Sequence, residues 1–274
     1  RRSDTWDAVV VGAGVMGAWT AWHLMRRGQR VLLLEAVGAA HAAASSGGES
    51  RLTRTIYGAD AIYTRMASES LADWQWLSER AGLPVFHRCG ALMFFHRREP
   101  FAEQSLEVHR QLRLPLEELT RADLERRYPQ VCWDGIELGL YEPSFGGLMA
   151  RRAVQTLVQE FVRAGSEYRL AKVLPPPQAD ASATRLEAVQ CADGTVVRAG
   201  NFVFACGAWL PQLLPDVLGK RIFPTRQEVY FFAPPAGDWR FEPEHLPAWA
   251  DYDAGDMHYG LPNLEGRGFK VAHD

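Results

Sequence analysis

The chain lacks the sequence patterns of several common protein classes. Its four cysteines, Cys89, Cys132, Cys191 and Cys206, are scattered and form no Cys-x-x-Cys pair, so neither a disulfide framework nor a zinc site is expected. Basic residues (30) do not exceed acidic residues (33), and the formal charge of −3 indicates no nucleic-acid partner. No apolar run suits a membrane span or a signal peptide. We therefore expect a soluble, cytoplasmic protein with no metal and no membrane partner.

The beginning of the chain contains the best-defined motif. An apolar run enters the turn Gly12-x-Gly14-x-x-Gly17, a helical stretch follows, and a second apolar strand ends at Glu35. This order matches the dinucleotide-binding fingerprint, in which the glycines allow a tight turn, approach of the pyrophosphate and close helix packing. The phosphates then meet the positive end of a helix, and the acid accepts ribose hydroxyls. An ordinary glycine-rich turn is the alternative, but it does not explain Glu35.

A stretch rich in alanine, glycine and serine follows Glu35 and includes Ser45 and Ser46. Small side chains either make a flexible linker or let the backbone pass close to a ligand. Arg51 and Arg54 come next, and their spacing predicts one shared face of a helical turn. Two guanidinium groups there suit a planar anion. For Arg54 the alternative is a surface or interdomain ion pair.

The chain of 274 residues, 47% of them hydrophobic, is long enough for one or two domains. A second strand and glycine turn, residues 201–209, is expected beside the first fingerprint. From Phe223 onwards, short β-type runs follow one another without helices, which is typical of an antiparallel sheet. We predict an α/β plus α+β fold. Residues 1–85 and 147–216 form a Rossmann-like domain, and residues 86–146 and 217–274 form a domain built on an antiparallel sheet flanked by helices.

Three local signals predict further elements. Residues 60–82 are expected to be a helix capped by Asp60. Its predicted apolar stripe is Ile62, Met66, Leu71, Trp74 and Leu77. Thr120-x-x-Asp123 resembles a capping box, and Asp193-Gly194 predicts a hairpin turn.

Five segments then occur in a recognisable order. They are the fingerprint, Ser46-Gly47-Gly48-Glu49-Ser50-Arg51-x-x-Arg54, the loop 141–147, Ala205-Cys206-Gly207-Ala208-Trp209, and Tyr259-Gly260 with Lys270. In this order they resemble the monomeric sarcosine oxidase family of the D-amino-acid-oxidase-like superfamily, which includes N-methyltryptophan oxidase and pipecolate oxidase. The resemblance implies a monomeric FAD enzyme that oxidises a secondary amine such as sarcosine to an imine and reduces dioxygen to hydrogen peroxide.

The resemblance also implies roles for individual residues. Arg54 matches the arginine that binds the substrate carboxylate, and Arg51 matches an arginine beside the flavin ring. Tyr259 matches a tyrosine lining the substrate cavity, and Lys270 matches the lysine that assists oxygen reduction. The residues expected to bind FAD are Gly12, Gly14, Val15, Met16, Gly17, Glu35, Ser45, Ser46, Arg51, Val173, Gly207 and Trp209.

Two alternatives remain open for the function. One is a dehydrogenase of the same fold that passes electrons to a carrier, against which Lys270 weighs. The other is a catalytically inactive FAD-binding subunit or fragment. The family continues past the position of Asp274 with a stretch that carries the cysteine bonded to the flavin, so we expect the C-terminal part of the family fold to be missing. Covalent and non-covalent attachment of FAD are both open, as is the identity of the secondary amine.

Overall fold

The computed structural model describes residues 5–176 and 185–273, and the chain divides into two compact units. The first unit comprises residues 1–49 and 150–225, and the second comprises residues 50–149 and 226–274. The first boundary therefore lies at residue 49 and not at the expected residue 85. The physical reason is that β3 (Arg51–Thr53) pairs with β8 (Gly146–Leu148) inside the second unit. The return to the second unit likewise comes after residue 225, later than the expected residue 216.

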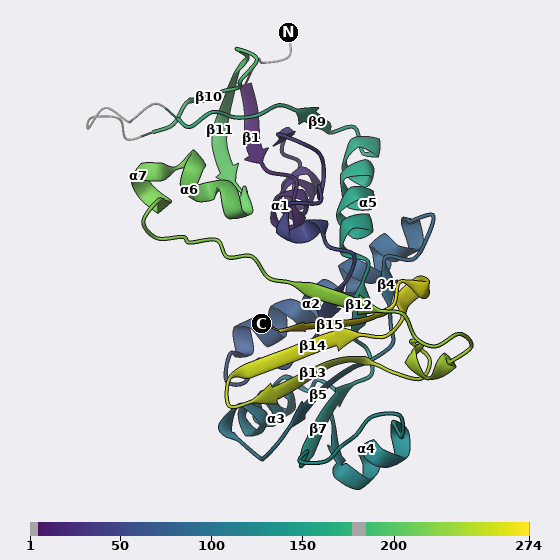
Figure 1. Cartoon of the computed structure of the whole chain (residues 1–274). Helices are drawn as coiled ribbons and strands as arrows, with labels where there is room; N and C mark the ends of the chain where they lie inside the picture. Colours follow the sequence, from purple (N-terminus) through teal and green to yellow (C-terminus); the bar gives the residue numbers. More distant parts are fainter. Residues whose placement is uncertain (1–4, 177–184, 274) are drawn as a thin grey trace. The chain divides into compact units, whose positions relative to one another are not determined.

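A five-stranded sheet forms the centre of the first unit (Figure 1). Its order is β10 (Ala188–Gln190), β11 (Val196–Phe204), β1 (Thr5–Val11), β2 (Val31–Glu35) and β9 (Glu167–Leu170). The last four strands run parallel, and β10 pairs antiparallel with β11 across the predicted Asp193-Gly194 turn. Every residue of β2 is buried, as its continuous apolar run predicts for an inner parallel strand.

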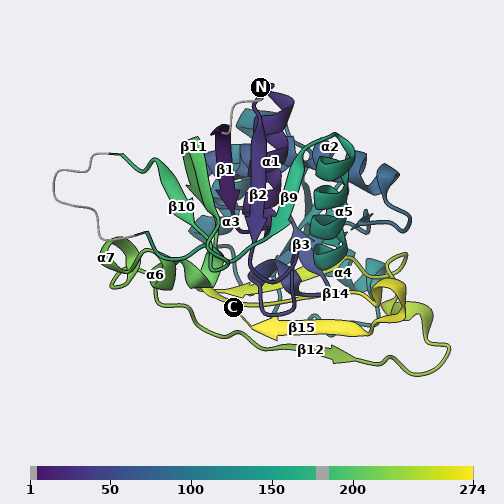
Figure 2. The same ribbon diagram turned by 90° about the horizontal axis from the view of Figure 1, so that it is seen from above.

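The two long helices of this unit each have an apolar face, and they bury it by packing against the sheet and against one another. Helix α1 (Val15–Arg26) packs on β1, β2 and α5 (Ala150–Arg163), as can be followed in Figure 2. In α5 the buried residues Ala153, Val154, Leu157 and Phe161 recur at helical spacing. The unit also contains η1 (Ser45–Gly47), η2 (Gly207–Trp209), α6 (Leu210–Leu213) and α7 (Pro215–Leu218).

The second unit contains two sheets. The larger has the order β12 (Val229–Phe232), β15 (Phe269–His273), β14 (Asp256–Leu261), β13 (Ala248–Asp253), β5 (Ala91–Phe95), β7 (Leu138–Glu142) and β6 (Glu117–Thr120). Its neighbours pair antiparallel except β13 and β5, which run parallel. The expected antiparallel sheet therefore has one parallel pair, and that pair joins the two sequence segments of the unit. The smaller sheet has the order β3-β8-β4, with β4 at Phe86–His87.

Alternate residues of β5 face two separate cores. Met93 and Phe95 pack in a cluster with Ala102 of α3 (Pro100–Leu112). Phe94 packs in another cluster with Leu124 of α4 (Arg121–Arg127). Because successive side chains of a strand point to opposite faces, α3 and α4 cover opposite faces of the large sheet (Figure 1). The unit also contains α2 (Ala61–Arg80), η3 (Trp239–Phe241) and η4 (Leu264–Gly266).

The local predictions have mixed outcomes. The capping box of α4 is confirmed, since Thr120 and Asp123 each accept a hydrogen bond from the backbone N–H of the other. Helix α2 is also confirmed, but Asp60 makes no side-chain cap bond. The predicted stripe is wrong at its start, because Ile62 and Met66 are 66% and 57% exposed. In the described parts of the chain no helix is both long and apolar enough to cross a membrane.

Candidate functional site

The turn between β1 and α1 has the geometry that a dinucleotide requires. Gly12 has φ +102°, in the region that favours glycine. A Cβ on Gly17 would lie 1.8 Å from the carbonyl oxygen of Gly12, so the helix packs this closely only without a side chain. A Cβ on Gly14 would meet only Ser46 Oγ, at 3.4 Å. The backbone at Gly14 is thus open to the approach of a phosphate.

Ser46 lies at the N-terminus of α1. Its Oγ accepts a hydrogen bond of 2.9 Å from the backbone N–H of Val15, while the N-cap residue, Gly14, has no side chain to offer. Both Ser45 and Ser46 belong to η1, and Met16 in the first turn is 72% exposed. The positive end of this twelve-residue helix therefore lies beside the open backbone of Gly14, which suits an anion.

Glu35 ends β2 and is 8% exposed. One carboxylate oxygen accepts from the N–H of Ala13 at 2.8 Å, and the other accepts from the N–H of Val37 at 3.0 Å. A carboxylate oxygen has a second lone pair, so ribose hydroxyls can still donate to it. Glu35 therefore also fixes the glycine turn, a structural role that the sequence did not reveal.

The second glycine turn lies beside the first, as expected. β11 is the parallel neighbour of β1, and a Cβ on Gly12 would lie 2.5 Å from the carbonyl oxygen of Ala205. Gly207 has φ +51° and opens η2. Trp209 at its end is 39% exposed, and its ring lies 5.2 Å from the ring of His41. The first unit thus gathers the two turns at the carboxyl ends of neighbouring parallel strands, where such sheets bind ligands.

Val173 fits the expected role less well. Its side chain lies in the hydrophobic core of the first unit, and its backbone forms an isolated bridge with Cys191. Only the backbone of Val173 is therefore suited to contact a cofactor. A hollow of about 900 Å³, lined by Thr5, Arg30 and Ser166 among others, lies at the amino-terminal edge of the sheet. A dinucleotide held by the fingerprint lies at the carboxyl ends of the strands, so this hollow is not its binding site.

Three of the predicted catalytic residues come together in the second unit around the carbonyl oxygen of Ser50. Lys270 Nζ donates to this oxygen at 2.9 Å, and Arg51 Nη1 donates to it at 3.0 Å. Lys270 Nζ also lies 5.3 Å from the ring centroid of Tyr259, a cation–π distance. The contact between Lys270 and Arg51 across a backbone carbonyl is a feature that sequence reasoning did not find.

The environment of Lys270 perturbs its titration. The side chain is 1% exposed. Burial, and to a lesser extent the positive charge of Arg51, together lower the pKa of Lys270 from 10.5 to about 8. At neutral pH the amine of Lys270 is still mostly protonated. It is therefore a fixed positive charge in a buried site, where the low polarity strengthens its electrostatic effect on nearby groups.

The side chain of Arg54 contacts two residues that follow it closely in the sequence. Its Nη1 donates to the carbonyl oxygen of Ile56, and its guanidinium lies 4.2 Å from the ring centroid of Tyr57. The predicted helical face for Arg51 and Arg54 is wrong, because residues 51–53 form strand β3. Side chains three apart in an extended chain point to opposite sides. The strand brings Arg51 to Lys270 and turns Arg54 towards Tyr57.

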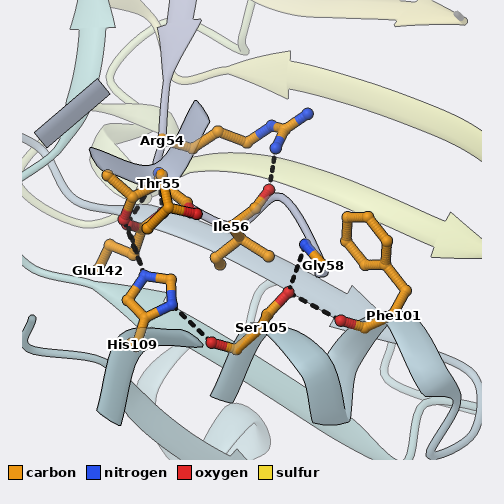
Figure 3. Close-up of polar contacts among 9 residues, drawn as sticks. Arg54, Thr55, Ile56, Gly58, Phe101, Ser105, His109 and Glu142 are labelled. Carbon is orange, nitrogen blue, oxygen red and sulfur yellow. Dashed lines mark hydrogen bonds and ion pairs between the residues drawn. The ribbon is translucent and has the colours of Figure 1, made fainter. Parts of the chain in front are cut away.

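A buried polar group beside Arg54 was not predicted. Thr55, His109 and Glu142 are 1%, 2% and 1% exposed and interact with one another (Figure 3). Glu142 lies in one of the five recognised segments, but no role was assigned to it. His109 could have been noticed, because it lies on the buried face of α3 with Ala102 and Val108.

A possible metal-ligand group lies elsewhere in the second unit. Asp256, His258 and His273 on β14 and β15 have ligand atoms within 4.8 Å of one another, and all three are exposed. His273 Nε2 and Asp256 Oδ1 are 2.6 Å apart, and the two histidine rings stack at 4.4 Å. As it stands the group is a surface ion pair, in which the hydrogen bond from His273 lowers the pKa of Asp256.

Comparison with known proteins agrees with this geometry. The family described as FAD dependent oxidoreductase matches residues 7–272. The chain is 34% identical over 273 residues to monomeric sarcosine oxidase of Streptomyces avermitilis, covering 98% of this chain and 70% of that protein. It is 25% identical to N-methyl-L-tryptophan oxidase of Yersinia pestis, covering 94% and 67%. The solved structure of NikD, described as an unusual amino acid oxidase, aligns with a TM-score of 0.69 at 25% identity, covering 98% of this chain and 70% of that chain.

Proposed function

Because the chain belongs to the family of FAD-dependent oxidoreductases, we propose that it oxidises the secondary amine of a small amino acid and reduces dioxygen to hydrogen peroxide. Its cofactor is FAD. Relatives are named for sarcosine and N-methyl-L-tryptophan, which are both secondary amines with a carboxylate. The substrate class is therefore an N-methyl or cyclic amino acid, and the protein is proposed to act as a monomer.

Residues of the first unit suit the nucleotide part of FAD. The open backbone at Gly14 and the N-terminus of α1 receive the pyrophosphate, and the carboxylate of Glu35 accepts the ribose hydroxyls. When bound, FAD supplies the acceptor for the hydride lost from the carbon next to the amine nitrogen, while the nitrogen loses a proton. Water then hydrolyses the resulting imine.

Arg54 is proposed to bind the substrate carboxylate. A guanidinium is a planar group with five N–H donors, and it matches the two oxygens of a carboxylate. The contact with Ile56 uses Nη1, so the guanidinium has further donors to offer. Tyr57 covers one face of the guanidinium at 4.2 Å and limits how it turns. Tyr259, half-buried on β14, is proposed to line the substrate cavity.

Lys270 and Arg51, the two cations at the Ser50 carbonyl, are the observation on which we base the proposed reduction of dioxygen. Reduction of dioxygen creates negative charge, and a fixed positive charge nearby stabilises it. Lys270 is held by burial and by its bond to Ser50, so it needs little reorganisation when that charge develops. Arg51 adds a second positive charge at the same oxygen. We propose that Lys270 assists oxygen reduction and that Arg51 stabilises the reduced cofactor.

One experiment tests this function. The protein is loaded with FAD and given sarcosine, pipecolate, proline and N-methyltryptophan, while peroxide release and the visible absorbance of the flavin are recorded. We expect peroxide with at least one of these amines and bleaching of the flavin when oxygen is removed. No bleaching with any of them would refute amine oxidation. Bleaching without peroxide would instead support the dehydrogenase that passes electrons to a carrier.

A further inference from the structure

We propose that Thr55, His109 and Glu142 form a buried clamp that fixes the backbone under Arg54 and so sets the affinity for the substrate carboxylate. The proposal rests on the carboxylate-binding role of Arg54 given above. The three residues come from the segment after β3, from α3 and from the end of β7, and all lie in the second unit. They are positioning residues, because they act through Arg54.

The clamp is held by a continuous set of hydrogen bonds (Figure 3). The backbone N–H of Thr55 donates to both carboxylate oxygens of Glu142, at 2.9 and 3.0 Å. The hydroxyl of Thr55 contacts Glu142 Oε1 as well, and it lies 2.9 Å from Nε2 of His109. On the other side of the ring, Nδ1 of His109 lies 2.7 Å from the carbonyl oxygen of Ser105.

Counting protons indicates that the clamp is neutral as a whole. A carbonyl oxygen only accepts, so Nδ1 of His109 carries a hydrogen. If the hydroxyl of Thr55 donates to Glu142, Nε2 of His109 must donate to the hydroxyl and the ring is positively charged. If the hydroxyl donates to Nε2, the carboxyl of Glu142 must carry the proton. Both arrangements hold the same number of protons, so no uncompensated charge is buried.

A second set of bonds fixes the chain three residues later. The N–H of Gly58 donates to Ser105 Oγ at 2.9 Å, and that hydroxyl donates to the carbonyl oxygen of Phe101 at 2.8 Å. The carbonyl of Thr55 is also bound, by the hydroxyl of Thr64 at 2.8 Å. The backbone is therefore anchored on both sides of Ile56 and Tyr57, the two residues that contact the Arg54 guanidinium.

This anchoring matters because residues 54–57 form no regular element. An irregular segment without such bonds samples many conformations, and each conformation would place the guanidinium differently. Ordering it on substrate binding would then reduce affinity, whereas a fixed segment avoids that cost. The clamp is thus expected to affect binding of the carboxylate more than the oxidation step that follows it.

The test compares variants that differ by one group. Thr55→Val removes the hydroxyl and keeps the shape, and it should raise both the KM of the amine and the Kd of acetate about tenfold, with kcat within about twofold. Thr55→Ser restores the hydroxyl and should restore both values. Glu142→Gln should also resemble the wild type, because its oxygen accepts from Thr55 N–H, its NH₂ donates to the hydroxyl, and the hydroxyl donates to neutral His109.

Leu124→Val is the control for stability. Leu124 is fully buried in the core on the opposite face of the sheet, so this variant should unfold at a lower temperature with an unchanged Kd for acetate. Acetate binding is read from the absorbance of bound FAD and needs no turnover. An unchanged Kd and KM in Thr55→Val would overturn the clamp. Wild-type protein that oxidises amines but binds no acetate would instead overturn the role of Arg54.

Hydrogen exchange tests the clamp without any variant. The amides of Thr55 and Gly58 donate to buried side chains, and they should exchange about a hundredfold more slowly than the amide of Ala59, an exposed residue of the same loop. Equal exchange rates at Thr55 and Ala59 would overturn the proposal even if Thr55→Val failed to fold.

Discussion

Replacing Lys270 by methionine should change how stability depends on pH. The pKa of Lys270 is about 8 in the folded protein and 10.5 in an ordinary environment. Between these values the unfolded chain binds more protons than the folded chain, so the wild type becomes more stable as pH rises through this window. Methionine fills a similar space but does not titrate. Stability of the variant relative to the wild type is therefore greatest near pH 7 and declines towards pH 10.5.

The size of this decline follows from the pKa. A lowering from 10.5 to about 8 corresponds to roughly 3 kcal/mol of differential free energy between the two protonation states. Methionine also loses the hydrogen bond to Ser50, but a neutral amine can make that bond too, so this loss contributes nearly equally at both ends of the window. The difference in free energy of unfolding between variant and wild type should thus fall by roughly 3 kcal/mol.

Two measurements check this prediction. Urea unfolding of both proteins at several pH values gives the difference directly, and the other titrating groups cancel in the subtraction. The chain contains only three lysines, Lys172, Lys220 and Lys270, so an NMR spectrum labelled at the lysine ε-carbon has three signals. The signal missing from Lys270→Met belongs to Lys270, and its midpoint should lie near pH 8. A midpoint near 10.5, or a difference that stays flat with pH, would refute the reasoning.

Four further outcomes are expected. Lys270→Met should slow peroxide release about a hundredfold while leaving anaerobic bleaching of the flavin, since it removes one stabilising charge; stopped-flow absorbance separates the two steps. Gly17→Ala would put a Cβ 1.8 Å from the Gly12 carbonyl oxygen, so it should cost at least about 3 kcal/mol and abolish FAD retention, seen as a colourless preparation. Glu35→Leu leaves two backbone N–H groups without their acceptor and should destabilise the first unit by about 2 to 6 kcal/mol, measured by urea unfolding. Arg54→Lys replaces a forked donor by a point charge and should raise the KM of the amine about tenfold in steady-state assays.

The glycine fingerprint was predictable because its requirements are local. Gly12, Gly17 and Glu35 are set by one turn, one helix and one strand, all close together in the sequence. The same holds for the capping box at Thr120 and for the hairpin at Asp193. The deciding contacts, Gly12 with Gly17, Ala13 with Glu35 and Thr120 with Asp123, join residues at most 22 positions apart, so a short sequence pattern indicates the structure.

The second unit was less predictable because its decisive contacts are distant in the sequence. The spacing of Arg51 and Arg54 fits a helix as well as a strand that ends in a turn, and pairing of Arg51 with Leu148 decides between them. The same pairing places residues 51–53 in the second unit, which is why the domain boundary lies at residue 49 and not at residue 85. Glu142 likewise accepts a hydrogen bond from Thr55, 87 positions away in the sequence, and no local sequence pattern predicts that bond.

The parallel pair of β5 and β13 has a consequence for the order of synthesis. Leu92 of β5 pairs with Trp249 of β13, and the chain between them contains most of the first unit. At ordinary ribosomal rates the wait between the two strands is on the order of 10 s. During that time all five residues of β5, which are buried in the finished protein, have one unpaired edge. The nascent chain should therefore depend on chaperones that shield strand edges until β13 has been synthesised.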